Sequence, residues 1–133
     1  MNYIIDSDIL IYFIKGQRDV VEKLINIPPQ NLFTTRINYT ELFYGAYNST
    51  RIKENLETVS GLLDRFQILE FDKNSSEIFA KVKANLKQNG NIIADMDLMI
   101  ASISISNNYI LVTNNIKHFE RIKNLKIEKW IEK

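Results

Sequence analysis

Residues 3–14 read YIIDSDILIYFI, and this stretch is the clearest indication of the fold. The short apolar run Tyr3-Ile4-Ile5 is followed by the polar residues Asp6-Ser7-Asp8 and then by a second apolar run at 9–14. This order predicts a strand, a polar turn and the beginning of a buried helix. The carboxylates that follow the strand are the first candidates for a functional site.

The alternation of helix and strand continues along the chain. Apolar residues at helical spacing occupy 20–25, and Pro28-Pro29 end that helix before a short strand at 32–34. A helix is then expected from Asn38 to Tyr47. Asn38 and Glu41 have the spacing of a capping box, which predicts that the helix begins there.

The middle of the chain adds two more helices. Apolar residues at steps of three and four predict an amphipathic helix from Ile52, which runs into a strand near 67–70. Ser75 or Ser76 is expected to open the next helix. That helix closes at Asn89-Gly90, because both residue types tolerate left-handed backbone.

The segment 98–106 is ambiguous by pattern. Serine and isoleucine alternate in it as they do in a strand, while Leu98, Ala101 and Ile105 form a helical stripe. Its length favours a helix. A helix also supplies the crossover that the clearer strand at 109–112 requires in a parallel sheet.

With a last short strand near 126–128, these elements predict a single α/β domain over residues 1–133. Its central sheet is mostly parallel, with four to five short strands and helices on both faces. The composition agrees, because 133 residues with 45% hydrophobic residues, four Gly and two Pro are typical of one globular domain.

Composition also excludes several classes of function. The chain has no Cys and one His, which excludes a disulfide framework and argues against a zinc site. The longest apolar run, 9–14, is six residues, whereas a membrane span needs about 20. Asp6 and Asp8 interrupt any resemblance to a signal peptide. We therefore expect a soluble cytoplasmic protein with no membrane partner.

The formal net charge of +1 gives no general attraction to nucleic acid. Residues 117–133 are locally basic, with six Lys or Arg against three Glu. An edge strand flanked by lysines explains this better than nucleic-acid binding does.

Acidic and amide side chains follow several of the predicted strands. In open α/β sheets ligands bind outside the carboxyl ends of the strands, so these residues are expected at one edge. Clustered carboxylates repel one another unless a cation neutralises them. Oxygen ligands suit Mg²⁺, with Mn²⁺ as a substitute. The residues concerned are Asp6, Asp8, Glu41, Asp95, Asp97 and the run Thr113-Asn114-Asn115.

Such a site suits phosphodiester hydrolysis, in which the cation activates a water and neutralises charge on the phosphate. The sequence lacks a glycine-rich phosphate loop and a cofactor fingerprint, and no Ser/His/Asp set surrounds His118. His118 itself is better explained as a surface or packing residue.

Each acid also has a purely structural explanation. Glu41 can be the partner of Asn38 in a capping box, and Asp95 and Asp97 suit the first turn of a helix. These explanations do not account for Asp6 at the same sheet edge. Taken together, the acids favour a metal site.

Four motifs, in order and spacing, resemble those of the PIN domain ribonucleases over the whole chain. The short length and the ending at 125–130 are similar to VapC-type toxins of toxin–antitoxin modules. The motifs are Tyr3-Ile4-Ile5-Asp6-Ser7-Asp8-Ile9-Leu10-Ile11, Thr40-Glu41-Leu42-Phe43-Tyr44-Gly45-Ala46, Asp97-Leu98-Met99-Ile100-Ala101, and Leu111-Val112-Thr113-Asn114-Asn115 with His118-Phe119.

The resemblance implies a Mg²⁺- or Mn²⁺-dependent endoribonuclease, commonly a homodimer, that a cognate antitoxin inhibits. It implies that Asp6, Glu41 and Asp97 are the metal ligands and that Asn115 completes the catalytic set, where many members carry a fourth acid. Asp95 ranks second to Asp97 in this comparison. Thr113 matches a supporting hydroxyl beside the site.

Two alternatives remain from the residues alone. A non-catalytic module of the same fold would use the acidic edge only to dock a basic partner peptide, without divalent ions or RNA turnover. A phosphoacceptor domain also gathers acids at strand ends. It would want a lysine after the last core strand, where this chain has Thr113-Asn114-Asn115.

Overall fold

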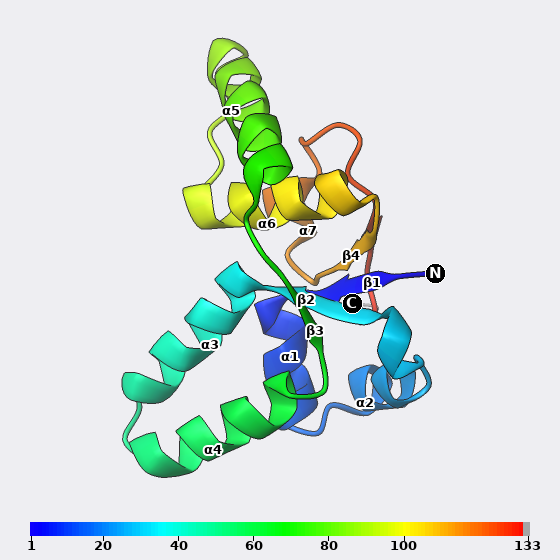
Figure 1. Ribbon diagram of the computed structural model, residues 1–133, viewed down its shortest axis with the longest axis vertical. Coiled ribbons are helices and arrows are strands. Elements are labelled where there is room, and N and C mark those ends of the chain that lie inside the picture. Colours follow the sequence, from blue (N-terminus) through cyan, green and yellow to red (C-terminus); the bar gives the residue numbers. More distant parts are fainter. Residues whose placement is uncertain (132–133) are drawn as a thin grey trace.

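The computed structural model describes residues 1–131, and within them the strands form one parallel sheet of five, in the order β3-β2-β1-β4-β5 (Figure 1). In the centre, Tyr3 of β1 is in register with Leu32 of β2 on one side and Ile110 of β4 on the other. The strands are β1 (Tyr3–Ile5), β2 (Leu32–Thr35), β3 (Gln67–Leu69), β4 (Ile110–Val112) and β5 (Ile127–Glu128).

Two groups of helices cover the two faces of this sheet (Figure 1). The first group is α1 (Ser7–Ile14), α2 (Arg18–Ile25), α3 (Arg36–Tyr47) and α4 (Ile52–Leu63), with the short 3₁₀ helix η1 (Pro29–Asn31) before β2. The second group is α5 (Lys73–Gln88), α6 (Asp95–Asn107) and α7 (Ile116–Phe119). The predicted α/β domain with helices on both faces is confirmed.

Alternation along the strands divides the core between the two faces. Ile5 and Val112 are fully buried against the first group of helices, whereas Ile4 and Leu111 are fully buried against the second. Successive strand side chains point to opposite faces, so each short strand contributes to both cores. This explains why the central strands β1 and β4 are apolar without interruption.

The ambiguous segment 98–106 lies within helix α6, as its length indicated. Its buried serines are compatible with a helix because the Ser102 and Ser104 hydroxyls donate to the carbonyls of Leu98 and Ile100, 2.7 and 2.9 Å away. The helix ends at Asn108, which is left-handed with φ 56°.

Two predicted helix starts are wrong. Helix α3 begins at Arg36, and its capping box joins Thr35 and Asn38 instead of Asn38 and Glu41. The reason is that Thr35 ends β2 with its hydroxyl already placed to accept from the Asn38 N–H, at 3.1 Å. Helix α5 begins earlier than Ser75, because Asp72 caps it by accepting from the Ser75 N–H at 2.9 Å.

The expected edge strand is β5, which pairs only with β4 in the described sheet. The last two residues of the basic stretch 117–133, Glu132 and Lys133, lie outside the described residues. No helix in the range 1–131 has the length and apolar character needed to cross a membrane.

The strand order reverses its direction between β1 and β4. Chain connections run outward from β1 through β2 to β3 on one side, and through β4 to β5 on the other. Open α/β sheets bind ligands at such a reversal, beyond the carboxyl ends of the strands. Asp6 directly follows β1 and Thr113 directly follows β4, so both lie at this position.

Candidate active site

Asp6 is the central residue of the candidate site. It links the end of β1 to the first turn of α1, and only 5% of it is exposed. Its Oδ1 accepts from the Asn38 amide and from the Ser7 N–H, each at 2.9 Å. Its Oδ2 accepts from the Thr113 hydroxyl at 2.7 Å. Three segments that are far apart in sequence therefore orient this carboxylate.

Glu41 lies in the second turn of α3, and it is half-buried beside Ser7. Its Oε1 accepts from the Ser7 hydroxyl at 2.7 Å and, more weakly, from the Asn38 amide at 3.5 Å. Because the capping box uses Thr35 and Asn38, Glu41 has no role as a helix cap. The structural explanation for Glu41 is therefore removed.

Asn38 connects the two carboxylates, and sequence reasoning assigned it only to a helix cap. It is fully buried, and its Oδ1 accepts from the Thr35 hydroxyl at 2.6 Å. Its amide nitrogen is then turned toward Asp6 and Ser7, each 2.9 Å away. The one available signal was its position three residues before Glu41, which places both on the same side of a helix.

Asp97 reaches the site from the first turn of α6. Its Oδ2 lies 3.1 Å from Nδ1 of His118, and the two side chains are 25% and 56% exposed. His118 is exposed, as expected of a surface residue, but the sequence did not predict its contact with Asp97. His118 lies on α7, whose buried Phe119 holds it against the sheet.

The other two candidates are placed differently. Asp95 has a side chain that is 62% exposed, and it pairs with Lys83 at 3.0 Å, which joins α6 to α5. Asn115 is exposed at the start of α7, and its N–H donates to the Thr113 hydroxyl at 3.1 Å. The structure thus connects Asn115 to Asp6 through Thr113, while Asp95 serves an ion pair.

Asp8 is a further, half-buried acid at this edge. Its Oδ2 accepts from the Asn114 N–H at 2.9 Å and its Oδ1 accepts from the Ile9 N–H at 2.8 Å. The carboxylate therefore ties the segment after β4 to the start of α1.

Burial and mutual repulsion make these carboxylates reluctant to ionise. Burial raises the pKa of Asp6, hydrogen bonds from Thr113, Ser7 and Asn38 oppose that shift, and the charge of Asp97 adds to it. Burial likewise raises the pKa of Glu41, with further contributions from the charges of Asp6 and Asp97. A cation bound among them would relieve this repulsion.

The donor set fits a hard divalent cation. Asp6, Glu41 and Asp97 offer carboxylate oxygens from three segments, and Mg²⁺ is usually held by one or two carboxylates with retained waters. In the part of the chain that the structure describes, no three acidic or histidine side chains gather closely enough to hold one ion together. A shared ion would thus use only some of these carboxylates directly.

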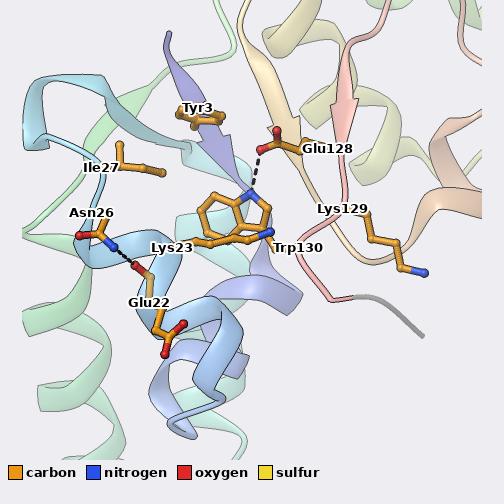
Figure 2. A pocket seen from close by; sticks show the side chains of 8 residues that line it. All are labelled: Tyr3, Glu22, Lys23, Asn26, Ile27, Glu128, Lys129 and Trp130. Carbon is orange, nitrogen blue, oxygen red and sulfur yellow. Dashed lines mark hydrogen bonds between the residues drawn. The ribbon is translucent and has the colours of Figure 1, made fainter.

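A cavity on another part of the described surface does not include these acids. The cavity, of about 450 Å³, opens between α2 and the C-terminal segment, where Tyr3 and Trp130 face it (Figure 2). The Trp130 indole N–H donates to Glu128 at 2.8 Å at its rim. None of Asp6, Glu41 or Asp97 lines it.

The titration of Asp8 leads to a prediction about stability. Burial and the neighbouring Asp6 charge raise the pKa of Asp8 from 3.8 to about 6. The folded state therefore binds this proton more tightly than the unfolded state does, and its contribution to the free energy of unfolding falls as pH rises from about 4 to about 6. We expect a loss of about 1–2 kcal/mol, after allowance for solvent screening of a partly exposed group.

Urea denaturation in EDTA at several pH values measures this loss. The Asp8→Asn variant lacks the titrating group, while Asp6 and Glu41 are common to both proteins. The difference in unfolding free energy between variant and wild type should therefore grow over this pH range. Parallel pH profiles for the two proteins would contradict the assignment.

Comparison with known proteins gives consistent matches along the chain. The model of the PIN domain family matches residues 3–125. Ribonuclease VapC2 of Haemophilus influenzae is 31% identical over 131 residues, which cover 98% of this chain and 99% of that protein. The tRNA(fMet)-specific endonuclease VapC of Salmonella typhimurium is 29% identical over 130 residues, with 98% of each chain covered.

A solved structure agrees with the fold. The crystal structure of VapBC2 from Rickettsia felis, bound to a DNA fragment from its promoter, contains a chain that superimposes on this one with a TM-score of 0.91. The two sequences are 34% identical, and the match covers 98% of this chain and 100% of that chain. The similarity therefore extends over the full domain, including every segment of the acidic edge.

Proposed function

This chain belongs to the PIN domain family, and on that premise we propose that it is a metal-dependent endoribonuclease, the toxin of a type II toxin–antitoxin pair. The observation that carries the proposal is the convergence of Asp6, Glu41 and Asp97 at one sheet edge, where burial and the nearby charges of Asp6 and Asp97 raise the pKa of Glu41. The names of the VapC relatives support RNA as the substrate.

In this proposal Asp6, Glu41 and Asp97 hold Mg²⁺ or Mn²⁺, some directly and some through water. The ion supplies positive charge, which favours ionisation of an attacking water and neutralises charge on the scissile phosphate. The chain's own part is to keep the carboxylates oriented and close together at a low cost in reorganisation.

Neighbouring polar side chains provide that orientation. Thr113 and Asn38 fix the two oxygens of Asp6, at 2.7 and 2.9 Å. Ser7 fixes Glu41, at 2.7 Å. Groups that orient ligands in this way tune both metal affinity and activity. His118 would do the same for Asp97 through their 3.1 Å contact.

Asn115 completes the catalytic set in this proposal. Its backbone is tied to Thr113, and its side chain is exposed beside the edge. As an amide it offers an uncharged oxygen where related proteins often carry an acid. The site therefore attracts a second cation less strongly, and we propose that a single ion is sufficient.

The substrate and partners follow from the relatives. The name of the Salmonella typhimurium relative, a tRNA(fMet)-specific endonuclease, makes a structured RNA such as tRNA the first substrate to test. We also propose a homodimer and a cognate antitoxin. Large apolar side chains are exposed on the adjacent helices α1 and α3, namely Ile11, Ile14, Tyr44 and Tyr47, and they offer a surface for association.

The test is incubation of the purified chain with total cellular RNA and with tRNA, in Mg²⁺, in Mn²⁺ and in EDTA, with new 5′ ends sequenced. We expect discrete cleavage that EDTA abolishes. Asp97→Asn should reduce it by about 100-fold or more, since ligand loss removes several kcal/mol of transition-state stabilisation. Asp95→Asn is the matched control, because Asp95 pairs with Lys83 and should leave cleavage within about twofold.

Two results would contradict the proposal. Absence of cleavage with every metal, in a protein shown to be folded, would favour a module that docks a basic peptide at the acidic edge. Equal losses in the Asp95 and Asp97 variants would show that the N-terminus of α6 acts through its fold or its charge alone.

A further inference from the structure

A cavity lies on the opposite side of α5 from the Lys83–Asp95 pair. It has a volume of about 610 Å³ and is formed by α5, by Ile105 near the end of α6, and by residues 121–124 after α7. We call it the α5 cavity. In Figure 1, α5 projects from the molecule above α6, and the orange segment after α7 curves beside it.

The rim of the α5 cavity is cationic. Lys81 reaches it from α5, and Arg121 and Lys123 reach it from the segment after α7. All three are exposed, and no ion pair of theirs is found among the described residues. Arg121 donates to the amide oxygen of Asn91 at 3.3 Å, which connects the two sides of the rim.

The lining contains amides and apolar groups in place of acids. Asn85, Asn91 and Asn124 provide hydrogen-bonding groups, and Ile78, Val82 and Ile122 provide an apolar floor. Within residues 1–131, no Asp or Glu lines the cavity. A volume of this size lies in the range of ligand sites, and the combination suits a nucleotide, whose phosphate is anionic and whose base is flat and partly apolar.

Positive charge is also concentrated in the half of the sequence that forms the α5 cavity. Residues 1–72 carry seven Lys or Arg and ten Asp or Glu, a net charge of −3. Residues 73–133 carry ten Lys or Arg and six Asp or Glu, a net charge of +4. The overall charge of +1 hides this asymmetry. An RNA approaching the acidic cleavage edge therefore needs cationic surface elsewhere to offset repulsion.

We propose that the α5 cavity is a second RNA-binding site, which holds substrate outside the cleavage site. The inference rests on the proposed nuclease function. Lys81, Arg121 and Lys123 contact backbone phosphates, and the apolar floor receives an unpaired base. Asp97 and Ile105 are eight residues apart on α6, about 12 Å along its axis, so one RNA can reach both sites.

The test compares two triple variants that each remove two Lys and one Arg. Lys81→Ala/Arg121→Ala/Lys123→Ala removes the cations of the α5 cavity. The control, Lys15→Ala/Arg18→Ala/Lys53→Ala, removes three exposed cations from α1, α2 and α4 or their ends. Binding of fluorescently labelled bulk bacterial tRNA is measured in EDTA, where metal-dependent cleavage is absent, at several salt concentrations.

We expect the cavity variant to bind tRNA at least 10-fold more weakly and to reduce the slope of log Kd against log salt by about 2, as loss of three phosphate contacts requires. The control should change neither quantity by more than about twofold. An equal loss of tRNA affinity in both variants, or no loss in the cavity variant, would overturn the inference. An unaltered RNA affinity with lost binding of an acidic partner protein would overturn it too, and would assign the cavity to that partner.

Cleavage assays separate this inference from the proposed function. The cavity variant should cut tRNA at least 10-fold more slowly at limiting substrate, yet cut a short oligonucleotide spanning the cleavage site at the wild-type rate. If the wild-type protein cuts no RNA but the cavity variant binds tRNA more weakly than the wild type, the nuclease proposal is refuted and the proposed binding site is retained. Should the triple variant fail to fold, Lys123→Glu alone, in an exposed turn, tests the same expectation.

Discussion

Replacing Asp6 by asparagine should lower metal-dependent RNA cleavage by about 1000-fold, because the loss of a central metal ligand removes several kcal/mol of transition-state stabilisation. The asparagine can retain the local contacts. Its oxygen still accepts from Asn38, and its amide can donate to the Thr113 hydroxyl, which rotates to accept. Initial cleavage rates in Mg²⁺, together with circular dichroism of the variant, measure the effect.

The same variant should be more stable than the wild type in EDTA. Burial raises the pKa of Asp6, which means that the ionised carboxylate is disfavoured in the fold at neutral pH. A neutral amide removes that cost, and we expect a gain of about 1 kcal/mol in unfolding free energy. Mg²⁺ should narrow the difference, since it binds the wild-type site more tightly.

Asp19→Asn is the matched control for both measurements. Asp19 is an exposed acid in the first turn of α2, outside the acidic edge. It should leave cleavage unchanged and alter stability by less than about 0.5 kcal/mol. Full metal-dependent activity in the Asp6 variant would exclude Asp6 as a ligand, and a loss of stability would show that its charge is needed by the fold.

Phe119→Ala should destabilise the protein by about 3–5 kcal/mol. Phe119 is completely buried in the cluster formed by α5, α6 and α7 against the sheet, where its neighbours include Leu111 and Ile122. Removing the ring leaves a cavity in this cluster and takes away the buried side chain that anchors α7. Urea denaturation at constant pH gives the change in unfolding free energy.

Lys117→Ala on the same helix is the control, and it should change stability by less than about 0.5 kcal/mol because Lys117 is exposed. Under conditions in which it is still folded, the Phe119 variant should also cleave RNA more slowly, because α7 places His118 in contact with Asp97. A cost below about 1 kcal/mol would mean that α7 is not anchored through this ring.

Much of the fold was predictable from local pattern. The stretch at residues 3–14 indicated a strand, a carboxylate turn and a buried helix, and these are β1, Asp6 and α1. Apolar periodicity located most of the remaining elements to within a few residues, but it predicted neither η1 nor α7. The errors were at helix starts, where the competing cap residues Thr35 and Asp72 were decided by the ends of the preceding segments.

The candidate site was only partly predictable. Asp6, Glu41 and Asp97 could be named because strand ends in parallel sheets share an edge. The roles of Asn38, Ser7 and His118 were not visible, because each depends on a side-chain direction set by packing between distant segments. The resemblance ranks Asp97 above Asp95, but only the structure shows their different partners, His118 and Lys83.

The sequence by itself determined the order of strands and helices, the apolar faces and the set of acids, since these depend on short-range periodicity and on residue chemistry. The tertiary structure alone decided which groups meet. Asp6 and Thr113 are 107 residues apart and make a 2.7 Å hydrogen bond because β1 and β4 are parallel neighbours in a particular register. The α5 cavity has the same origin: α5 and the segment after α7 become neighbours only when both pack on one face of the sheet. Periodicity does not encode that adjacency, because it depends on the long-range burial of apolar faces.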